Sequence, residues 1–187
     1  FIANDGTTGA ELWRSDGTAE GTQLVKDILA GNSGINSYSS ACVAGSSLFF
    51  LANNGTSGTE LWKTDGTADG TLLMKDFNAG IAGASYGNFV AIGSSIYFTV
   101  TNPPTTSISL WQSNGTPEGT IALPSAVYPE SPTLSTLWIT ANNQLLAKSY
   151  FNAAINFELL KATLQPGGSS LLKDINTVSN GSAPNYL

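Results

Sequence analysis

The sequence of 187 residues contains no histidine and one cysteine, Cys42. Histidine is the commonest general base and the commonest metal ligand in proteins, so its absence excludes the catalytic triads and metal centres that depend on it. A single cysteine cannot form a disulfide within the chain. Cys42 lies in the apolar run Ala41–Ala44, which favours a small core residue over a reactive thiol.

Charge is scarce as well. Only 11% of the residues are charged, and seven Lys and Arg against thirteen Asp and Glu give a formal net charge of −6. A nucleic acid partner requires a basic patch that neutralises phosphate, which seven scattered cations do not supply, so we expect no such partner. No apolar run approaches the roughly 18 residues of a membrane span, so we expect no membrane insertion.

What the sequence does contain is an internal repeat. The segment Glu11–Thr18 returns with small changes as Glu60–Thr67 and again, weaker, as Ser109–Thr116, and a fourth copy keeps only Glu158–Lys161. The central leucine falls at positions 12, 61, 110 and 159, a constant spacing of 49 residues. We divide the chain into units at about 1–38, 39–87, 88–133 and 134–182, with 183–187 starting a further unit.

Each unit is predicted to hold four short strands. In the second unit, turn residues such as Gly, Asn and Asp separate apolar segments at about 40–44, 47–52, 59–64 and 71–77. No segment has a sustained helical period, so the fold class is all-β. The repeated residues that we expect to build the units are Leu12, Trp13, Asp16, Gly17, Leu61, Trp62, Asp65, Gly66, Leu110, Trp111, Asn114 and Gly115.

Four antiparallel strands in about 49 residues make a unit the size of a β-propeller blade. One blade cannot bury both faces of its sheet, and the repeated tryptophan is large enough to fill the space between two blades. Four repeats form either a four-bladed propeller or part of a larger ring, and the start of the sequence in mid-strand favours part of a larger ring. A β-solenoid is the rival architecture, but its coils are usually shorter.

The repeated segments resemble the ELWxxDGT repeat family, in which Glu-Leu-Trp-x-x-Asp-Gly-Thr is followed by Gly-Thr and a Leu-Val-Lys-Asp-Ile-like strand. The first two units carry this motif almost throughout, with Gly21-Thr22 and Gly70-Thr71 downstream. The resemblance implies a bacterial secreted or cell-surface protein with a propeller-like fold that is exported from the cytoplasm. It implies no catalytic residue.

The repeated acidic residues have two kinds of interpretation. Asp16, Asp65 and Asn114 precede glycine, and side chains of this kind bond to their own backbone in tight turns. The alternative is a calcium site built from Asp5, Asp16 or Glu20, although calcium requires about six oxygens and several converging carboxylates. The repeated glutamates are expected to form surface or interblade pairs with repeated cations, namely Lys26, Lys75 and Lys173, or Arg14, Lys63 and Lys161.

We therefore expect a non-enzymatic interaction or structural module, extracellular or at the cell surface, that acts in adhesion, as a scaffold or in filament or surface assembly. Its partner would be a surface protein or glycan, with self-assembly or membership of a larger complex possible and no cofactor. Specific contacts would lie in the loops where the copies differ, around 29–38, 78–87, 101–107 and 125–133.

Two further functions remain open. A carbohydrate-binding propeller would carry its repeated aromatic residue at exposed loop positions, whereas the tryptophan here falls within a predicted strand. A glycoside hydrolase-like domain would require two carboxylates about 5–10 Å apart in a cleft. Non-repeated residues such as Glu130 and Asp5 are the candidates for such a pair.

Overall fold

In the computed structural model, the described residues are 1–35, 41–101 and 108–123, together with the strands at 133–139, 145–151, 156–162 and 170–173. These residues form strands and connections and contain no helix, so the prediction of an all-β chain is confirmed. Consequently, this part of the chain has no helix that is long and apolar enough to span a membrane.

The first two repeats each form one antiparallel sheet with its strands in sequence order. The first sheet contains β1 (Ile2–Asn4), β2 (Ala10–Arg14) and β3 (Gln23–Lys26). The second sheet contains β4 (Cys42–Ala44), β5 (Ser47–Asn53), β6 (Thr59–Thr64) and β7 (Leu72–Lys75). These four strands lie where the sequence predicts them, with ends that differ by at most two residues or so.

The remaining repeats form two further sheets. In the third sheet, β8 (Ser85–Tyr86) and β9 (Val90–Ile92) both pair with β10 (Ser95–Thr101), which is followed by β11 (Ile108–Ser113) and β12 (Thr120–Ala122). The fourth sheet contains β13 (Thr133–Ile139), β14 (Leu145–Phe151), β15 (Asn156–Ala162) and β16 (Ser170–Lys173).

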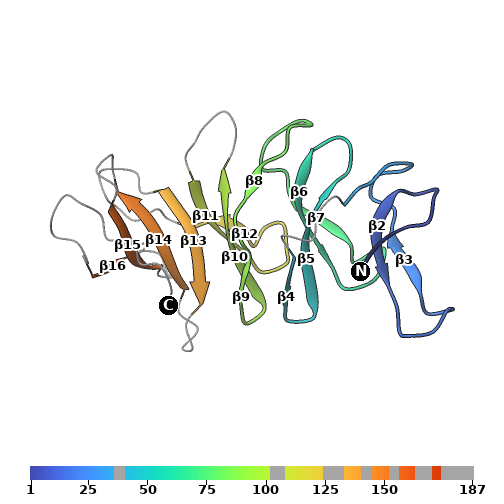
Figure 1. The fold of residues 1–187 in the computed structure, drawn as a ribbon, viewed down its shortest axis with the longest axis horizontal. Helices are drawn as coiled ribbons and strands as arrows, with labels where there is room; N and C mark the ends of the chain where they lie inside the picture. Colours follow the sequence, from blue (N-terminus) through green and yellow to red (C-terminus); the bar gives the residue numbers. More distant parts are fainter. Residues whose placement is uncertain are drawn as a thin grey trace.

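The four sheets stand side by side in a row that follows the sequence (Figure 1). Strand β4 of the second sheet contacts β9 and β10 of the third, and β13 of the fourth contacts β9 and β11. The first and fourth sheets lie at opposite ends of the row, so these sheets do not close into a four-membered ring.

Side chains alternate across each sheet, and β6 shows why both faces are buried. Leu61 pairs with Leu51 and points to one face, while Trp62 pairs with Phe50 and points to the other. Leu61 is fully buried and Trp62 is only 7% exposed. The central strand of the second sheet is therefore covered on both sides, which is possible only because a sheet lies on each side.

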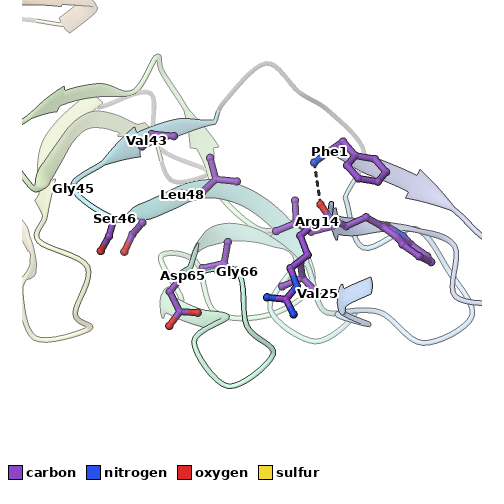
Figure 2. A pocket seen from close by; sticks show the side chains of 13 residues that line it. Phe1, Arg14, Val25, Val43, Gly45, Ser46, Leu48, Asp65 and Gly66 are labelled. Carbon is purple, nitrogen blue, oxygen red and sulfur yellow. Dashed lines mark hydrogen bonds between the residues drawn. The ribbon is translucent and has the colours of Figure 1, made fainter. Parts of the chain in front are cut away.

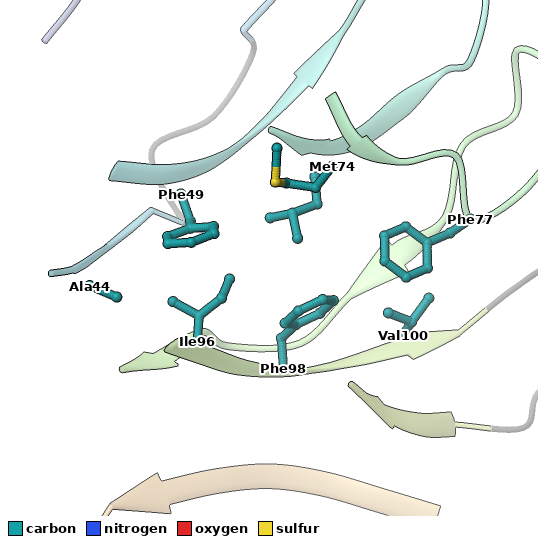
Figure 3. Close-up of a cluster of buried hydrophobic side chains, with 8 residues drawn as sticks. Ala44, Phe49, Met74, Phe77, Ile96, Phe98 and Val100 are labelled. Atoms are coloured by element: carbon teal, nitrogen blue, oxygen red, sulfur yellow. The ribbon is translucent and has the colours of Figure 1, made fainter. Parts of the chain in front are cut away.

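A hydrophobic cluster joins the second and third sheets (Figure 3). From the second sheet come Phe49, Leu61 and Met74, and from β10 come Ile96, Phe98 and Val100. Phe77, in the connection between the two sheets, meets the rings of Phe98 and Trp111 edge to face at centroid distances of 5.9 and 4.8 Å. Cys42 packs partly buried against this cluster.

A second cluster joins the first and second sheets. It combines Leu12, Val25 and Ile35 of the first repeat with Phe50, Ala52 and Trp62 of the second. In both clusters, the tryptophan-bearing face of one sheet packs against the leucine-bearing face of the sheet before it. We call these the tryptophan face and the leucine face. The repeat thus stacks head to tail, with one kind of interface used twice.

Candidate functional site

The Asp-Gly-Thr loop between the last two strands of a repeat is held by its own side chains. In the second repeat, Oδ1 of Asp65 accepts hydrogen bonds from the backbone N–H and the hydroxyl of Thr67, at 2.9 and 2.7 Å. The hydroxyl oxygen of Thr67 in turn accepts a bond from the N–H of Gly70 at 2.9 Å. The hydroxyls of Thr64 and Thr71 lie 2.7 Å apart at the base of the loop. These bonds satisfy backbone groups that have no strand partner.

The same bonds recur in the first and third repeats. The hydroxyl of Thr18 donates to Asp16 at 2.7 Å, and the hydroxyl of Thr116 donates to Asn114 at 2.8 Å. An amide oxygen therefore replaces a carboxylate without loss of the loop, which agrees with the turn interpretation. The hydroxyl of Thr18, followed by its backbone N–H, lowers the pKa of Asp16, and Thr67 lowers that of Asp65 in the same way.

Two glycines in this loop are required by geometry. Gly66 has a φ of 92°, which residues with a side chain rarely adopt. Gly70 has no such φ, but a Cβ added there would lie 2.0 Å from Oδ1 of Asp65. The corresponding distance is 1.9 Å both for Gly21 with Asp16 and for Gly119 with Asn114. The second glycine of the motif thus makes room for the acidic or amide side chain.

The candidate calcium ligands do not all lie together. Asp5 precedes β2 and Asp16 follows it, so these two residues lie at opposite ends of one strand, while Glu20 shares a loop with Asp16. Oδ1 of Asp5 accepts bonds from the N–H groups of Thr7 and Thr8, each at 2.8 Å. These backbone bonds, with Thr8 the largest cause, lower the pKa of Asp5. Among the described residues, no group of three acidic, Cys or His side chains is placed to hold a metal.

The repeated glutamates are buried rather than paired with cations at the surface. Glu11 and Glu60 are both fully buried. Oε1 of Glu11 accepts bonds from the N–H groups of Leu29 at 3.2 Å and Gly34 at 2.9 Å. Both donors lie in the connection that leaves the first sheet. The expected pairing of Glu11 with Lys26 or Arg14 is therefore wrong, because its carboxylate holds the outgoing connection instead.

Glu60 plays the same part in the second repeat. Its Oε2 accepts a bond of 3.2 Å from the N–H of Phe77, in the connection that leaves the second sheet, and another from the hydroxyl of Tyr86. The other oxygen, Oε1, is buried and has no hydrogen-bond partner among the described residues. Burial raises the pKa of both Glu60 and Glu11, against the lowering effect of their hydrogen bonds. The expected pairing of Glu60 with Lys75 or Lys63 is likewise wrong.

The cations reach forward to the next repeat. Nζ of Lys26 donates to the carbonyl oxygens of Ala68 and Thr71 at 3.2 and 2.8 Å, and Nζ of Lys63 donates to the carbonyl of Gly115 at 2.9 Å. These acceptors belong to the Asp-Gly-Thr or Asn-Gly-Thr loop of the following repeat. The lysines therefore link neighbouring repeats, and their partners are backbone carbonyls rather than carboxylates.

The sequence does contain a signal for the role of the glutamates. In the third repeat, Ser109 replaces the glutamate, and the chain after Gly119-Thr120 also departs from the repeat. The fourth repeat keeps both Glu158 and the Leu-Lys-Asp segment. The fourth repeat thus keeps both the glutamate and the segment that leaves the sheet, and the third repeat has lost both. In the structure, Ser109 makes a different bond, accepting from Nε1 of Trp111 at 2.8 Å.

Several candidate residues lie outside the described parts of the chain. Glu130 lies outside the described residues, as do parts of the loops at 29–38, 101–107 and 125–133. Glu158, Lys161 and Lys173 belong to described strands whose side chains are not described. The interpretation of Glu130 with Asp5 as a carboxylate pair consequently stays a hypothesis.

A pocket of about 340 Å³ opens between the first and second sheets (Figure 2). One wall consists of Phe1, Leu12, Trp13, Arg14 and Val25 from the first repeat. The other consists of Val43, Gly45, Ser46, Ser47, Leu48, Thr64, Asp65 and Gly66 from the second. The lining of the pocket is mostly apolar, with Arg14 and Asp65 among its polar residues. The pocket was not predicted from the sequence, although several residues of the repeated motif line it.

No protein-family model matches the chain, and a search of curated proteins finds no significant match either. The resemblance to the ELWxxDGT repeats accordingly stays a prediction from the motif.

Proposed function

We propose that the chain forms part of a β-propeller that serves as a non-enzymatic interaction or structural module, exported to the cell surface or beyond. The observation that carries this proposal is the use of the repeated polar residues. Asp65 and its equivalents build loops, Glu11 and Glu60 hold connections, and Lys26 links repeats. The repeated residues therefore build the framework of the sheets. The positions that vary between the copies are the ones that remain for contact with a partner.

The packing of the sheets supports propeller blades as the architecture. Both described clusters join a tryptophan face to the leucine face of the preceding sheet, so a heterologous contact occurs twice along the row. Such contacts extend until the rotation between neighbours closes a ring. Because the row of four sheets is open, the proposal is a ring with more than four blades.

The position of the tryptophan supports an interaction module over a lectin. A sugar platform requires an exposed aromatic face, but Trp62 is only 7% exposed and lies in the cluster between two sheets. The exposed apolar side chains are found elsewhere. Ile81 is 79% exposed and Leu72 is 44% exposed, and the first repeat carries the polar residues Asn32 and Gln23 at these positions. Exposed apolar residues that differ between copies fit contact with a partner.

The test exploits this internal difference. A Leu72→Gln and Ile81→Asn double variant takes the residues of the first repeat, so it should fold and melt like the wild-type chain. Immobilised wild-type chain should capture a surface protein or glycan from source cells, and the double variant should capture markedly less. An antibody against the chain should also label intact, unpermeabilised cells.

Other results would contradict the proposal. Equal capture by the double variant would show that Leu72 and Ile81 do not contact the captured partner. Labelling only after permeabilisation would contradict export. Glycan-array binding that Trp62→Phe abolishes without a change in melting would support a lectin, and turnover of a glycoside would support a hydrolase.

A further inference from the structure

The two polar residues of the Glu-Leu-Trp segment share one face of their strand. Glu60 and Trp62 are two positions apart in β6, and side chains at this spacing point to the same side of a sheet. Their exposed fractions are 0% and 7%. Oε1 of Glu60 and Nε1 of Trp62 are buried and have no hydrogen-bond partner among the described residues. Because buried polar atoms in proteins are nearly always hydrogen-bonded, this pair of atoms marks a site for a further group.

The third repeat shows where the indole of this segment finds a partner. Nε1 of Trp111 donates to the hydroxyl oxygen of Ser109 at 2.8 Å. Ser109 occupies the position that Glu60 has in the second repeat. The tryptophan of a repeat can therefore bond to a group beside the residue two positions before it, on its own strand.

The two indoles have corresponding surroundings. Trp62 pairs with Phe50 across the hairpin. Trp111 likewise pairs with Phe98, and each tryptophan packs in the cluster that its sheet forms with the preceding sheet. We therefore expect Nε1 of Trp62 to face the side chain of Glu60, as Nε1 of Trp111 faces Ser109.

The chemistry of the two atoms defines what can bind between them. Oε2 of Glu60 already accepts bonds from the N–H of Phe77 and the hydroxyl of Tyr86, so Oε1 is the oxygen that remains. A group that satisfies both unpaired atoms must accept a hydrogen bond from the indole N–H and donate one to the carboxyl oxygen. A cation would be repelled by the N–H dipole and an anion by the carboxylate, whereas water both accepts and donates.

We propose that a buried water molecule bridges Nε1 of Trp62 and Oε1 of Glu60. The water would supply the hydrogen bonds that a serine hydroxyl supplies in the third repeat. It accounts for a third repeat that keeps its tryptophan without the glutamate, because the hydroxyl of Ser109 bonds to the indole directly. Neither the site nor its ligand depends on the proposed function.

The bridge would connect the two interfaces of the second sheet. Trp62 packs in the cluster shared with the first sheet, and Glu60 bonds to Tyr86 of the third sheet. Water between Trp62 and Glu60 would complete one chain of hydrogen bonds that crosses the second sheet. The glutamate would thus hold both the outgoing connection and the tryptophan of its own strand.

The first experiment is a crystal structure of the whole chain at a resolution that places ordered water. We expect one water within hydrogen-bond distance, about 2.7–3.2 Å, of both Oε1 of Glu60 and Nε1 of Trp62. The direct bond between Ser109 and Trp111 is the internal control, and no water should lie between these two residues. A direct bond between Glu60 and Trp62, or a site without water, would overturn the proposal.

The second experiment follows the indole N–H signals of the whole chain by nuclear magnetic resonance, because a hydrogen bond moves such a signal downfield. Trp62→Phe assigns the signal of Trp62. Glu60→Leu removes the acceptor of the water, so the Trp62 signal should move upfield. Glu60→Gln keeps an oxygen at this place and should leave the signal nearly where it is in wild type.

Ser109→Ala is the matched control in the third repeat. It removes the partner of Trp111, so the signal of Trp111 should move upfield while that of Trp62 stays in place. Melting of each variant verifies that it folds. If Glu60→Leu folds and leaves the Trp62 signal unchanged, the indole has no bond that depends on Glu60 and the proposal is overturned. If Glu60→Leu does not fold, the crystal structure of the wild-type chain decides.

Discussion

At the scale of single residues, the most informative feature is a carboxylate that is buried without a cation. Glu11 and Glu60 are fully buried and accept bonds from backbone N–H groups 17 to 23 residues further along the chain. Burying a carboxylate costs free energy unless hydrogen bonds compensate for it. One oxygen of each glutamate lacks a partner among the described residues, so the compensation is incomplete. This explains why burial raises the pKa of both groups.

The pKa of Glu60 leads to a prediction about pH. Because the folded pKa is raised above the ordinary value of about 4.5, the stability that Glu60 contributes is fully present below that value and is lost as pH rises through the folded pKa. A Glu60→Gln variant keeps an oxygen for the N–H of Phe77 but does not titrate. Its free energy of unfolding should therefore rise relative to wild type between about pH 4 and pH 8.

Urea denaturation across this pH range measures the difference between the two proteins. Tyr86→Phe is the matched control. It removes a hydrogen bond that lowers the pKa of Glu60, so in this variant the loss of stability with rising pH should be larger and extend to higher pH than in wild type. Parallel stability curves for wild type and Glu60→Gln would contradict this account of the buried carboxylate.

At the scale of elements, the Asp-Gly-Thr loop explains most of the repeated motif. The acidic or amide residue, the threonine and the second glycine form one set of contacts that returns in three repeats. The set is local, because all its members lie within eight residues of sequence. The motif is therefore conserved between copies for the geometry of a loop that joins two strands.

A substitution at Gly70 tests this loop. Gly70→Ala adds a Cβ where Oδ1 of Asp65 lies 2.0 Å away, so the carboxylate must move and release Thr67. We expect a loss of about 1–3 kcal/mol in the free energy of unfolding, the usual cost of steric overpacking. Asp69→Ala, at an exposed position of the same loop, should leave stability nearly unchanged. Equal stability of the two variants, measured by chemical denaturation, would rule out the close contact as the reason for the glycine.

At the scale of the whole molecule, packing between neighbouring sheets decides which repeated side chains are buried. Both described hydrophobic clusters join a tryptophan face to the leucine face of the sheet before it, as neighbouring units do in other repeat proteins. Trp62 lies in one of these clusters and is only 7% exposed.

This burial predicts a large effect of substitution. Trp62→Ala should lower the free energy of unfolding by about 3–5 kcal/mol, the usual cost of removing a large buried side chain. Leu72→Ala in the same sheet should cost clearly less, because Leu72 is 44% exposed and less of it leaves a packed environment. Thermal and urea denaturation of the two variants provide the comparison. Equal losses would contradict the packing of Trp62 between two sheets as a source of stability.

Much of the fold follows from the sequence alone, because the information involved is local. The 49-residue spacing, the turn residues and the alternation of apolar side chains predict one sheet per repeat and the strands of the second repeat. The contacts of Asp65 follow from turn chemistry within a few residues. The burial of the tryptophan between two sheets follows from its place in a strand, because a sheet with two apolar faces needs a neighbour on each side.

Other features depend on residues that the sequence keeps far apart. The site of Glu60 is completed by Tyr86, which lies 26 residues away in another sheet, so the motif around Glu60 could not reveal its burial. The partners of Lys26 lie 42 and 45 residues away in the next repeat. The sequence by itself thus determined the repeating unit, whose contacts are local, and only the tertiary structure decided the contacts between units, because these depend on which surfaces stacking brings together.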